Sequence, residues 1–155
     1  MNVRQATRAD LKTIAAIHQE SIRELCKDHY SPQQIVDWTA ALSGAAYSEL
    51  LHSRTLLVLE DAAQLLGFSV LDADAARINA TYVSPGAARR GGGRSPMEAI
   101  EVAARAGGCT QLRLNATLNA VPFYERLGYT SNGTSSNRLP SGIELPCIVM
   151  SKPLV

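Results

Sequence analysis

The spacing of apolar residues along the first third of the chain predicts two helices. Leucines and isoleucines recur at roughly helical intervals, at Leu11, Ile14, Ile17, Ile22 and Leu25. This stripe predicts an amphipathic helix that ends near Cys26 and follows a capping-box-like start at Thr7 and Asp10. A second helix is predicted from Pro32, because Ser31 can cap its N terminus and proline is tolerated at the first helical position.

Runs of apolar residues in the middle of the chain predict a β-meander. A short first strand over 2–6 precedes the helices, and residues 47–52 form either a short helical segment or a loop. The three strands of the meander are predicted over 55–60, 65–71 and 77–83. Because short polar turns join these strands, we expect them to pair antiparallel.

After the meander, helices and strands alternate. A helix is expected to begin at Gly92 or Gly93, because Pro96 must lie in its first turn. The next strand, over 112–115, should lie parallel to 77–83, as in other strand–helix–strand units. The remaining elements are a short helix, a strand, a polar Ser/Asn/Gly-rich loop and a last strand, over 119–127, 129–130, 131–142 and 143–151.

The resulting order β-α-α-β-β-β-α-β-α-β-β predicts the α/β (α+β) class, with a mixed, mostly antiparallel central sheet and helices on both faces. With 155 residues and no internal repeat or linker, the chain is expected to form one domain over 1–155. No apolar run approaches the roughly 18 residues of a membrane span, and none at the N terminus is typical of a signal peptide.

Charge and cysteine usage narrow the function classes. The formal net charge of +1 argues against binding nucleic acid through overall charge, so any anion site must be local. Cys26, Cys109 and Cys147 are scattered without Cys-x-x-Cys spacing, and the three histidines share no metal-like spacing. We therefore expect reduced thiols, a cytoplasmic protein and no metal site.

The stretch 82–97 carries the clearest candidate for a binding site. A strand that ends in a turn at 84–86 leads to three glycines flanked by Arg89, Arg90 and Arg94, and a helix follows. Glycines let the backbone approach a ligand, and the first N–H groups of a helix attract anions such as phosphate. The alternative is a flexible, solvated basic loop, since neither the P-loop nor the dinucleotide glycine pattern is present.

This stretch resembles motif A of the GNAT superfamily of N-acetyltransferases. Val83-x-Pro85 matches the end of the motif's strand, and Gly91 and Gly93 stand at its two glycine positions. The first motif position, usually Arg or Gln, is Ala88 here, and this departure could weaken affinity for CoA. The backbone amides that would hold a pyrophosphate do not depend on that side chain.

The resemblance extends over essentially the whole chain. Residues 119–129 are similar to the family's second signature, Ala-x-x-Phe-Tyr-x-x-x-Gly-Phe/Tyr. The opening over 3–10 and the tail over 142–154 also resemble small members of the family. Two motifs at the right separation imply the GNAT fold and an N-acetyltransferase activity that uses acetyl-CoA.

The resemblance also implies where acetyl-CoA would bind. The pyrophosphate is expected at the amides of 89–95, and the pantetheine arm is expected to pair with 81–83 like an additional strand. The expected acetyl-CoA-binding residues are Thr81, Tyr82, Val83, Arg89, Arg90, Gly91, Gly92, Gly93, Arg94, Ser95 and Asn119. For Asn119, a plain helix N-cap is the alternative to a CoA contact.

Tyr124 matches the tyrosine that protonates the CoA thiolate in many family members, and it is the expected catalytic residue. The alternative is an aromatic residue that only packs in the core. No general base is evident: Glu60 is one candidate, and a chain of water molecules is another. Residues of the first two helices that could select the acceptor are Glu20, Glu24, Asp28, His29, Tyr30 and Trp38, although each could equally lie on a solvated face.

The sequence therefore predicts an acetyl-CoA-dependent N-acetyltransferase that acetylates a primary amine of a small molecule, peptide or protein. A non-catalytic GNAT-fold module that binds acyl-CoA is the alternative function. An anion- or nucleic-acid-binding module is disfavoured by the balanced charge. No nucleic acid or membrane partner is expected, the amine is unidentified, and a homodimer is one option for assembly.

Overall fold

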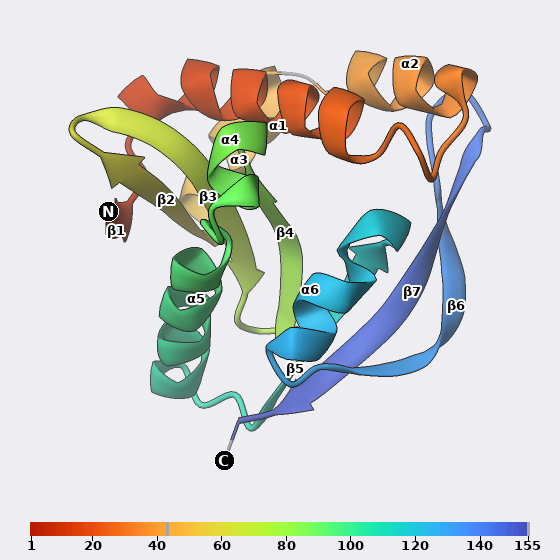
Figure 1. Cartoon of the computed structure of the whole chain (residues 1–155). Helices are drawn as coiled ribbons and strands as arrows, with labels where there is room; N and C mark the ends of the chain where they lie inside the picture. The colour runs from red at the N-terminus through yellow and green to blue at the C-terminus, as the bar shows by residue number, and fades with distance from the viewer. Residues whose placement is uncertain (43, 155) are drawn as a thin grey trace.

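The computed structural model describes residues 1–42 and 44–154. Its centre is one seven-stranded sheet in the order β1-β2-β3-β4-β5-β7-β6, in which only β4 and β5 run parallel (Figure 1). The strands are β1 (Asn2–Gln5), β2 (Thr55–Asp61), β3 (Gln64–Asp72), β4 (Arg77–Val83), β5 (Gln111–Thr117), β6 (Thr130–Arg138) and β7 (Glu144–Pro153). The predicted fold class, the meander and the parallel neighbour are confirmed.

The helices cover both faces of this sheet. They are α1 (Leu11–Leu25), α2 (Pro32–Ala40), α3 (Gly44–Ser53), α4 (Pro85–Arg89), α5 (Arg94–Ala106) and α6 (Val121–Arg126). On one face, Ile14 and Ile17 of α1 pack on Val58, Phe68 and Val70 of the sheet. On the other face, α5 and α6 pack on the alternate residues of the strands, among them the fully buried Leu112.

The predicted helix starts are borne out by the caps that form. Ser31 Oγ accepts from the backbone N–H of Gln34 at 3.1 Å, and the Gln34 side chain accepts from the N–H of Ser31 at 2.8 Å. At the first helix, the N–H of Thr7 donates to Asp10 at 2.7 Å. Arg4 also donates to both carboxylate oxygens of Asp10 and lowers the pKa of that group to about 2.

Of the two options for residues 47–52, the helical segment is confirmed, as part of the longer helix α3, which contacts α1 and β2. Two other local predictions need correction. The expected turn at 84–86 begins the short helix α4 instead, with Pro85 at its first position. Helix α5 begins at Arg94 with Gly93 as N-cap, slightly later than predicted, although Pro96 does lie in the first turn.

The largest error concerns 131–142, which was expected to be a loop. Most of this stretch belongs to β6, whose residues are all exposed and which pairs with β7 along nearly its whole length. No apolar alternation marks such a strand, because it is held by backbone pairing at the sheet edge rather than by burial of side chains. β6 and β7 form a hairpin at one edge of the sheet, and its far end lies beside α2 (Figure 1).

The parallel pair β4–β5 separates soon after it forms. The two strands pair only at Arg77↔Arg113 and Ile78↔Leu114, and the pairing of β4 with β3 is irregular at Asn79, between Ala80 and Ile78. β5 then continues alongside β7. Within the described residues, the stretch from Asn79 to Val83 therefore has no strand partner on its β5 side. A V-shaped opening results in the middle of the sheet.

No helix among the described residues is long and apolar enough to cross a membrane. The three cysteines are free thiols, and Cys26 and Cys147 are buried. Within 1–42 and 44–154, no group of three or more His, Cys, Asp or Glu side chains is placed to hold a metal ion.

Candidate active site

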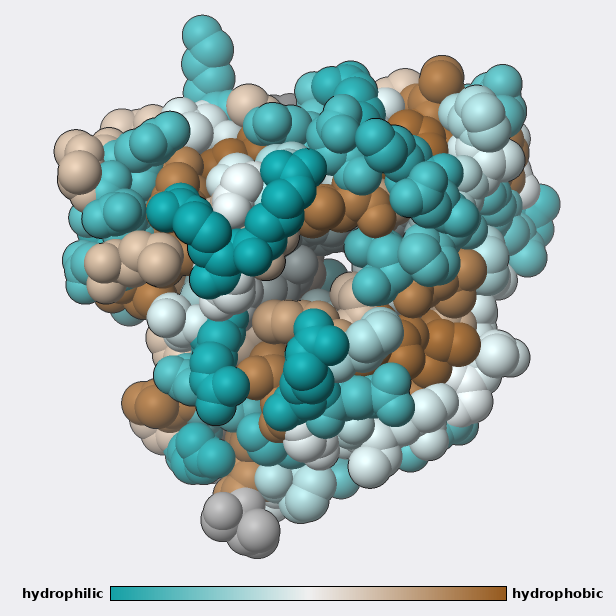
Figure 2. All heavy atoms as spheres, viewed as in Figure 1, coloured by the Kyte–Doolittle hydropathy of each residue, from teal (hydrophilic) through white to brown (hydrophobic). Residues whose placement is uncertain are grey.

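A cavity of about 370 Å³ lies beside the glycine-rich loop, and we call it the loop cavity. Its wall comes from α1, β4, the loop, the start of α5, and α6 with the turn before it. The wall residues include Ser21, Thr81, Tyr82, Val83, Ala88, Gly91, Gly93, Arg94, Thr117, Asn119, Phe123, Tyr124 and Arg126. Figure 2 shows a hollow in this part of the surface, below α1 and between α4 and α6.

The glycine-rich loop is tied closely to the end of α4. The backbone N–H groups of Arg90 and Gly92 donate to the carbonyl of Ala87, at 3.1 and 2.7 Å. Gly91 adopts φ +73°, a conformation that favours glycine. These N–H groups are therefore already hydrogen-bonded within the protein, and fewer backbone amides of 89–95 are free to bind a ligand than predicted.

Two amides at the start of α5 remain available to a ligand. The N–H groups of Gly93 and Ser95 have no hydrogen-bond acceptor among the residues that the structure describes. The first N–H groups of a helix have no intrahelical partner and carry partial positive charge. Of these residues, Gly93 lines the loop cavity together with Arg94, while Ser95 lies outside its wall.

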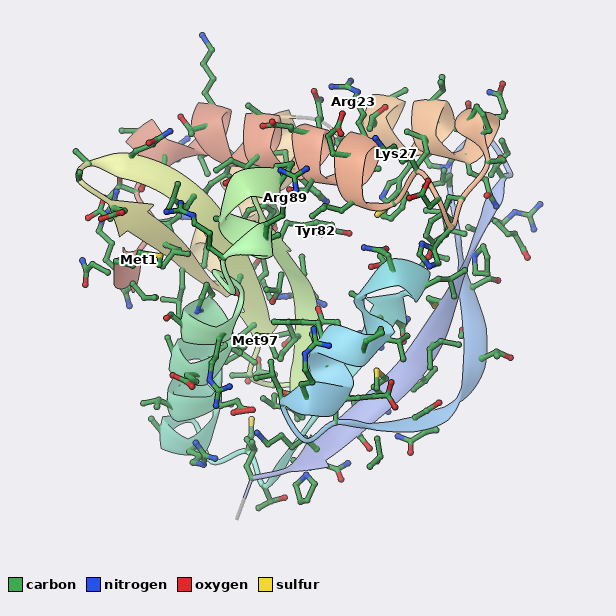
Figure 3. The ribbon with its side chains drawn as sticks, viewed as in Figure 1. Met1, Arg23, Lys27, Tyr82, Arg89 and Met97 are labelled. Carbon is green, nitrogen blue, oxygen red and sulfur yellow. The ribbon has the colours of Figure 1, made fainter. Side chains whose placement is uncertain are left out.

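The arginines around the loop differ in position. Arg94 lines the loop cavity and pairs with Glu98 at 2.9 Å on the exposed side of α5. Arg89 and Arg90 are exposed and are not part of the cavity wall. Figure 3 shows Arg89 on α4, above the loop. Arg126 of α6 does line the cavity, although the sequence analysis did not single it out.

The predicted strand positions Thr81, Tyr82 and Val83 all line the loop cavity. Ser84 N–H donates to Leu66 of β3, so the alternation of a strand directs the main-chain groups of Thr81 and Val83 to the open side of β4. One of these groups is already used, because Ser21 Oγ of α1 donates to the carbonyl of Val83 at 2.6 Å.

Tyr124 lies where the loop cavity reaches the opening between β4 and β5. It is 7% exposed, and it also lines a small pocket of about 30 Å³ that we call the gap pocket, together with Asn79, Thr81 and Asn115. Burial raises the pKa of the Tyr124 phenol to about 12, while a hydrogen bond with the Thr81 side chain acts in the opposite direction. The phenol is therefore protonated at neutral pH and lies beside the unpaired stretch of β4.

Asn119 has an unusual environment for its side chain. Its Oδ1 atom is buried and has no hydrogen-bond partner among the described residues. Asn119 is inside the short turn Leu118–Ala120 that precedes α6, and the N-cap of that turn is Thr117. The plain N-cap alternative is thus wrong, and within the described residues the cavity wall carries a buried acceptor without a hydrogen-bond partner.

A second cavity, of about 330 Å³, lies on the other side of the opening, between α1, α2 and the β6–β7 hairpin, and we call it the hairpin cavity. Its wall residues include His18, Tyr30, Trp38, Arg77, Asn79, Tyr82, Asn115, Thr117, Asn137 and Cys147. Tyr82 and Thr117 line this cavity, the gap pocket and the loop cavity. The gap pocket therefore lies between the two larger cavities.

The imidazole of His18 forms part of an aromatic group on the hairpin cavity. Its Nδ1 lies 2.7 Å from the hydroxyl of Tyr47, and its ring centroid is 4.2 Å from that of Tyr82. Burial lowers the pKa of His18 to about 4, so the ring is neutral at neutral pH. This arrangement could not be predicted from the sequence, because Tyr47 and Tyr82 belong to elements far from His18 along the chain.

The other acceptor-site candidates divide into two groups. Tyr30 and Trp38 line the hairpin cavity, and the Tyr30 hydroxyl donates to the carbonyl of Pro146 at 2.6 Å. The four remaining candidates are exposed and line neither cavity: Glu20, Glu24, Asp28 and His29.

The candidate general base and the predicted acetyl-CoA-binding residues do not all lie at one site. Glu60 pairs with Arg4 at 3.2 Å near the β1 edge and lines neither cavity, so its candidacy as general base is wrong. Of the predicted acetyl-CoA-binding residues, the structure brings together on the loop cavity Thr81, Tyr82, Val83, Gly91, Gly93, Arg94 and Asn119. Arg89, Arg90, Gly92 and Ser95 lie outside its wall.

Comparison with known proteins identifies the family. The model of the acetyltransferase (GNAT) domain matches residues 26–147. Because this match spans most of the chain, the chain belongs to the GNAT family of N-acetyltransferases. Along 129 residues, 83% of this chain and 81% of the relative, it is 26% identical to the uncharacterized N-acetyltransferase YafP of Escherichia coli strain K12.

Solved structures agree with this assignment. The fold matches a GCN5-related N-acetyltransferase from Rhodopseudomonas palustris with a TM-score of 0.91 and 28% identity, covering 98% of this chain and 94% of that one. It also matches the PaiA N-acetyltransferase of Thermoplasma acidophilum, solved in complex with coenzyme A, with a TM-score of 0.77 and 19% identity over 98% of both chains.

Proposed function

We propose that this chain transfers the acetyl group of acetyl-CoA to a primary amine of a small molecule, peptide or protein. The proposal places acetyl-CoA in the loop cavity and the amine in the hairpin cavity. The observation that carries it is the position of Tyr124, whose buried phenol borders both the loop cavity and the gap pocket between the two cavities. A proton donor at that point can serve a sulfur arriving from one side and a nitrogen arriving from the other.

The loop cavity has features that fit each part of CoA. The free amides of Gly93 and Ser95, with Arg94 and Arg126, suit a pyrophosphate. The open side of β4 offers main-chain groups for the amides of pantetheine. The orphaned Oδ1 of Asn119 suits a donor such as a pantetheine amide N–H. A CoA complex of the Thermoplasma acidophilum neighbour supports the same ligand class.

The reaction requires the chain to position the two substrates and to donate one proton to the departing sulfur. The amine nitrogen forms a bond to the acetyl carbon, the carbon–sulfur bond breaks, and the nitrogen loses one proton. Tyr124 Oη gives its proton to the departing sulfur, and a phenol held neutral by burial is suited to that role. The phenol then regains a proton from solvent, so protons balance over the cycle.

The amine must reach the acetyl group without its extra proton. Among the described residues, no carboxylate lines the hairpin cavity, so no Asp or Glu of this wall can act directly as the general base. Side-chain amides and hydroxyls from Asn79, Asn115 and Thr117 surround the opening instead. These groups can order water that carries the amine proton to solvent.

Two measurements on the same protein test the proposal. Acetyl-CoA and CoA should raise the melting temperature, because a ligand that binds only the native state stabilises it. A panel of amines and peptides should then release CoA thiol from acetyl-CoA at rates above hydrolysis. Melting shifts with acetyl-CoA but no acceptor-dependent thiol release across the panel would favour the alternative, a non-catalytic module that binds acyl-CoA. The absence of any melting shift would contradict CoA binding itself.

A further inference from the structure

The hairpin cavity has an unusual charge for a site that would receive an amine. Arg77, in the first position of β4, lines it and contributes a positive charge. The remaining titratable side chains of the wall are His18, Tyr30, Tyr82 and Cys147. Burial lowers the pKa of His18 to about 4 and raises the pKa of the other three groups, so all four are uncharged at neutral pH.

The environment of Arg77 includes a carboxylate that pairs with another arginine. Within the described residues, Arg77 forms no ion pair, although its register partner on β3, Asp72, lies nearby. Asp72 pairs with Arg54 instead, at 3.3 Å. Burial raises the pKa of the Cys147 thiol, which also lines the cavity, and the positive charge of Arg77 acts in the opposite direction.

Neighbouring side chains complete a set of hydrogen-bond donors. The amides of Asn79, Asn115 and Asn137 line the same cavity, so the wall offers a planar guanidinium together with amide N–H groups. Guanidinium groups bind carboxylates and related oxyanions through two parallel hydrogen bonds. A diamine or polyamine would instead bring two or more positive charges to a wall that carries one positive charge and no negative one.

We propose that the acceptor of this enzyme is a small primary amine that also carries an oxyanion, such as the carboxylate of an amino acid, and that Arg77 binds this oxyanion. The inference rests on the proposed acetyltransferase function and specifies its substrate class. The cavity volume of about 330 Å³ suits a molecule of amino-acid size. Arg77 thereby holds one end of the acceptor while the amine points toward Tyr124.

Sets of matched acceptors test the proposal on the intact protein. Each amino acid is compared with its carboxamide, with the amine left by removing the carboxylate, and with the aminoalkylphosphonate of the same skeleton. The readout is thiol release from acetyl-CoA. We expect the best acid to exceed its carboxamide in kcat/KM by roughly 10- to 100-fold, the effect of one charge-assisted interaction. The phosphonate arm shows whether the site prefers a carboxylate or a tetrahedral oxyanion.

A substitution at Arg77 provides the direct test. Arg77→Gln should raise KM for the acid and reduce its preference over the carboxamide to within about threefold, while KM for acetyl-CoA stays unchanged. Arg113→Gln is the matched control, because Arg113 faces Arg77 in the β4–β5 register but is exposed and does not line the cavity. Arg113→Gln should keep the full preference for the acid.

Binding can be measured without turnover. Trp38 is the single tryptophan of the chain and lines the hairpin cavity, so its fluorescence should respond to the acid in the presence of CoA. The affinity for the acid measured from this response should fall roughly tenfold or more in Arg77→Gln and should be unchanged in Arg113→Gln.

Three outcomes separate this inference from the function on which it rests. Carboxamides or diamines that match or exceed the acids would overturn the oxyanion assignment and leave acetyl transfer intact. Retention of the acid preference in Arg77→Gln would overturn the role of Arg77. Absence of acceptor-dependent thiol release with every amine would contradict both the inference and the proposed function.

Discussion

His18 of α1 and Tyr47 of α3 are joined through their side chains, with His18 Nδ1 2.7 Å from the Tyr47 hydroxyl. The contact connects two helices on the same face of the sheet, at the wall of the hairpin cavity. Burial lowers the pKa of His18 from 6.5 to about 4, so the folded protein keeps the ring neutral in conditions where an unfolded chain protonates it. The pair therefore connects stability to pH.

Acid should destabilise the protein through His18. For a group whose folded pKa is depressed, stability is fully present above pH 6.5 and is lost as the pH falls toward 4. We expect the free energy of unfolding to fall by about 2 kcal/mol between pH 7 and pH 4.5 from this group. Urea titrations at several pH values measure it. Asp10, with a pKa lowered to about 2, loses its contribution only below pH 3.8.

His18→Gln is the control for this effect, since glutamine can still hydrogen-bond to Tyr47 but does not titrate. The variant should show a flatter dependence of stability on pH between 7 and 4.5. An equal slope in the variant and the wild type would show that another group controls acid stability in this range.

Tyr124→Phe should reduce turnover by roughly 10²–10⁴-fold if the phenol protonates the departing sulfur. KM for acetyl-CoA should hardly change, because the lost interaction matters mainly in the transition state. Because the pKa of Tyr124 is raised to about 12, the phenol stays protonated, and wild-type turnover should show no loss from its deprotonation between pH 6 and 10. Initial rates with saturating acetyl-CoA measure both effects.

Tyr129→Phe is the matched control for Tyr124. Tyr129 is also a buried tyrosine, but its hydroxyl donates to Glu101 at 3.3 Å and it lines neither cavity. Its variant should retain turnover. If Tyr124→Phe also stays within twofold of the wild type while binding acetyl-CoA normally, Tyr124 is a core aromatic residue and not the proton donor.

The glycine-rich loop gives a prediction about binding. A Cβ at Gly93 would lie 2.8 Å from the end of the Phe123 ring, which lines the loop cavity, so Gly93→Val should push that ring into the CoA site. Affinity for CoA should fall by at least about tenfold, the effect of moderate overpacking. Gly91→Val should also impair binding, through strain at φ +73° rather than through contact.

Gly86→Ala tests whether the effect is specific to the cavity. A Cβ at Gly86 meets nothing within 4 Å, and the residue lies exposed in α4, so alanine should be neutral or slightly stabilising. Melting shifts with CoA report binding in all three variants. A full shift in Gly93→Val would contradict the placement of CoA in the loop cavity.

Arg126→Ala should weaken CoA binding by about 1–2 kcal/mol, as expected for a charge-assisted contact at a partly exposed site. Arg126 lines the loop cavity, and it has no ion-pair partner within 1–42 and 44–154, whereas Arg94 forms an ion pair with Glu98. The loss should shrink at high salt, because exposed charges are screened. Arg105→Ala, at the far end of α5, should leave affinity unchanged in the same titrations.

The sequence was most informative where local chemistry decides structure. The limits of β4 and the cap at Ser31 follow from residues within a few positions of each other. β6 could not be predicted in the same way, because its exposed Ser, Asn and Thr residues form a strand only through pairing with β7. The shared location of Arg77 and His18 could not be predicted for a related reason. Neither residue is distinctive within the sequence of its own helix or strand, and only tertiary packing brings both to one cavity.

An ion pair joins α5 to β7. Lys152 Nζ donates to both carboxylate oxygens of Glu101, at 2.7 and 3.1 Å, and the Glu101 side chain is 8% exposed. Lys152→Met should destabilise the fold by about 3 kcal/mol, because it leaves a buried carboxylate with the Tyr129 hydroxyl alone. Urea unfolding measures the change, and the slope of the transition should stay constant.

Replacing both partners of the pair distinguishes an unpaired charge from lost packing. In Glu101→Met/Lys152→Met no charge remains buried, so most of the lost stability should return, as replacement of a buried ion pair by apolar side chains is often nearly neutral. The melting shift produced by CoA should be the same in the single and double variants, because neither residue lines the loop cavity. A double variant no more stable than Lys152→Met would show that the loss comes from packing or hydrogen bonds rather than from an unpaired buried charge.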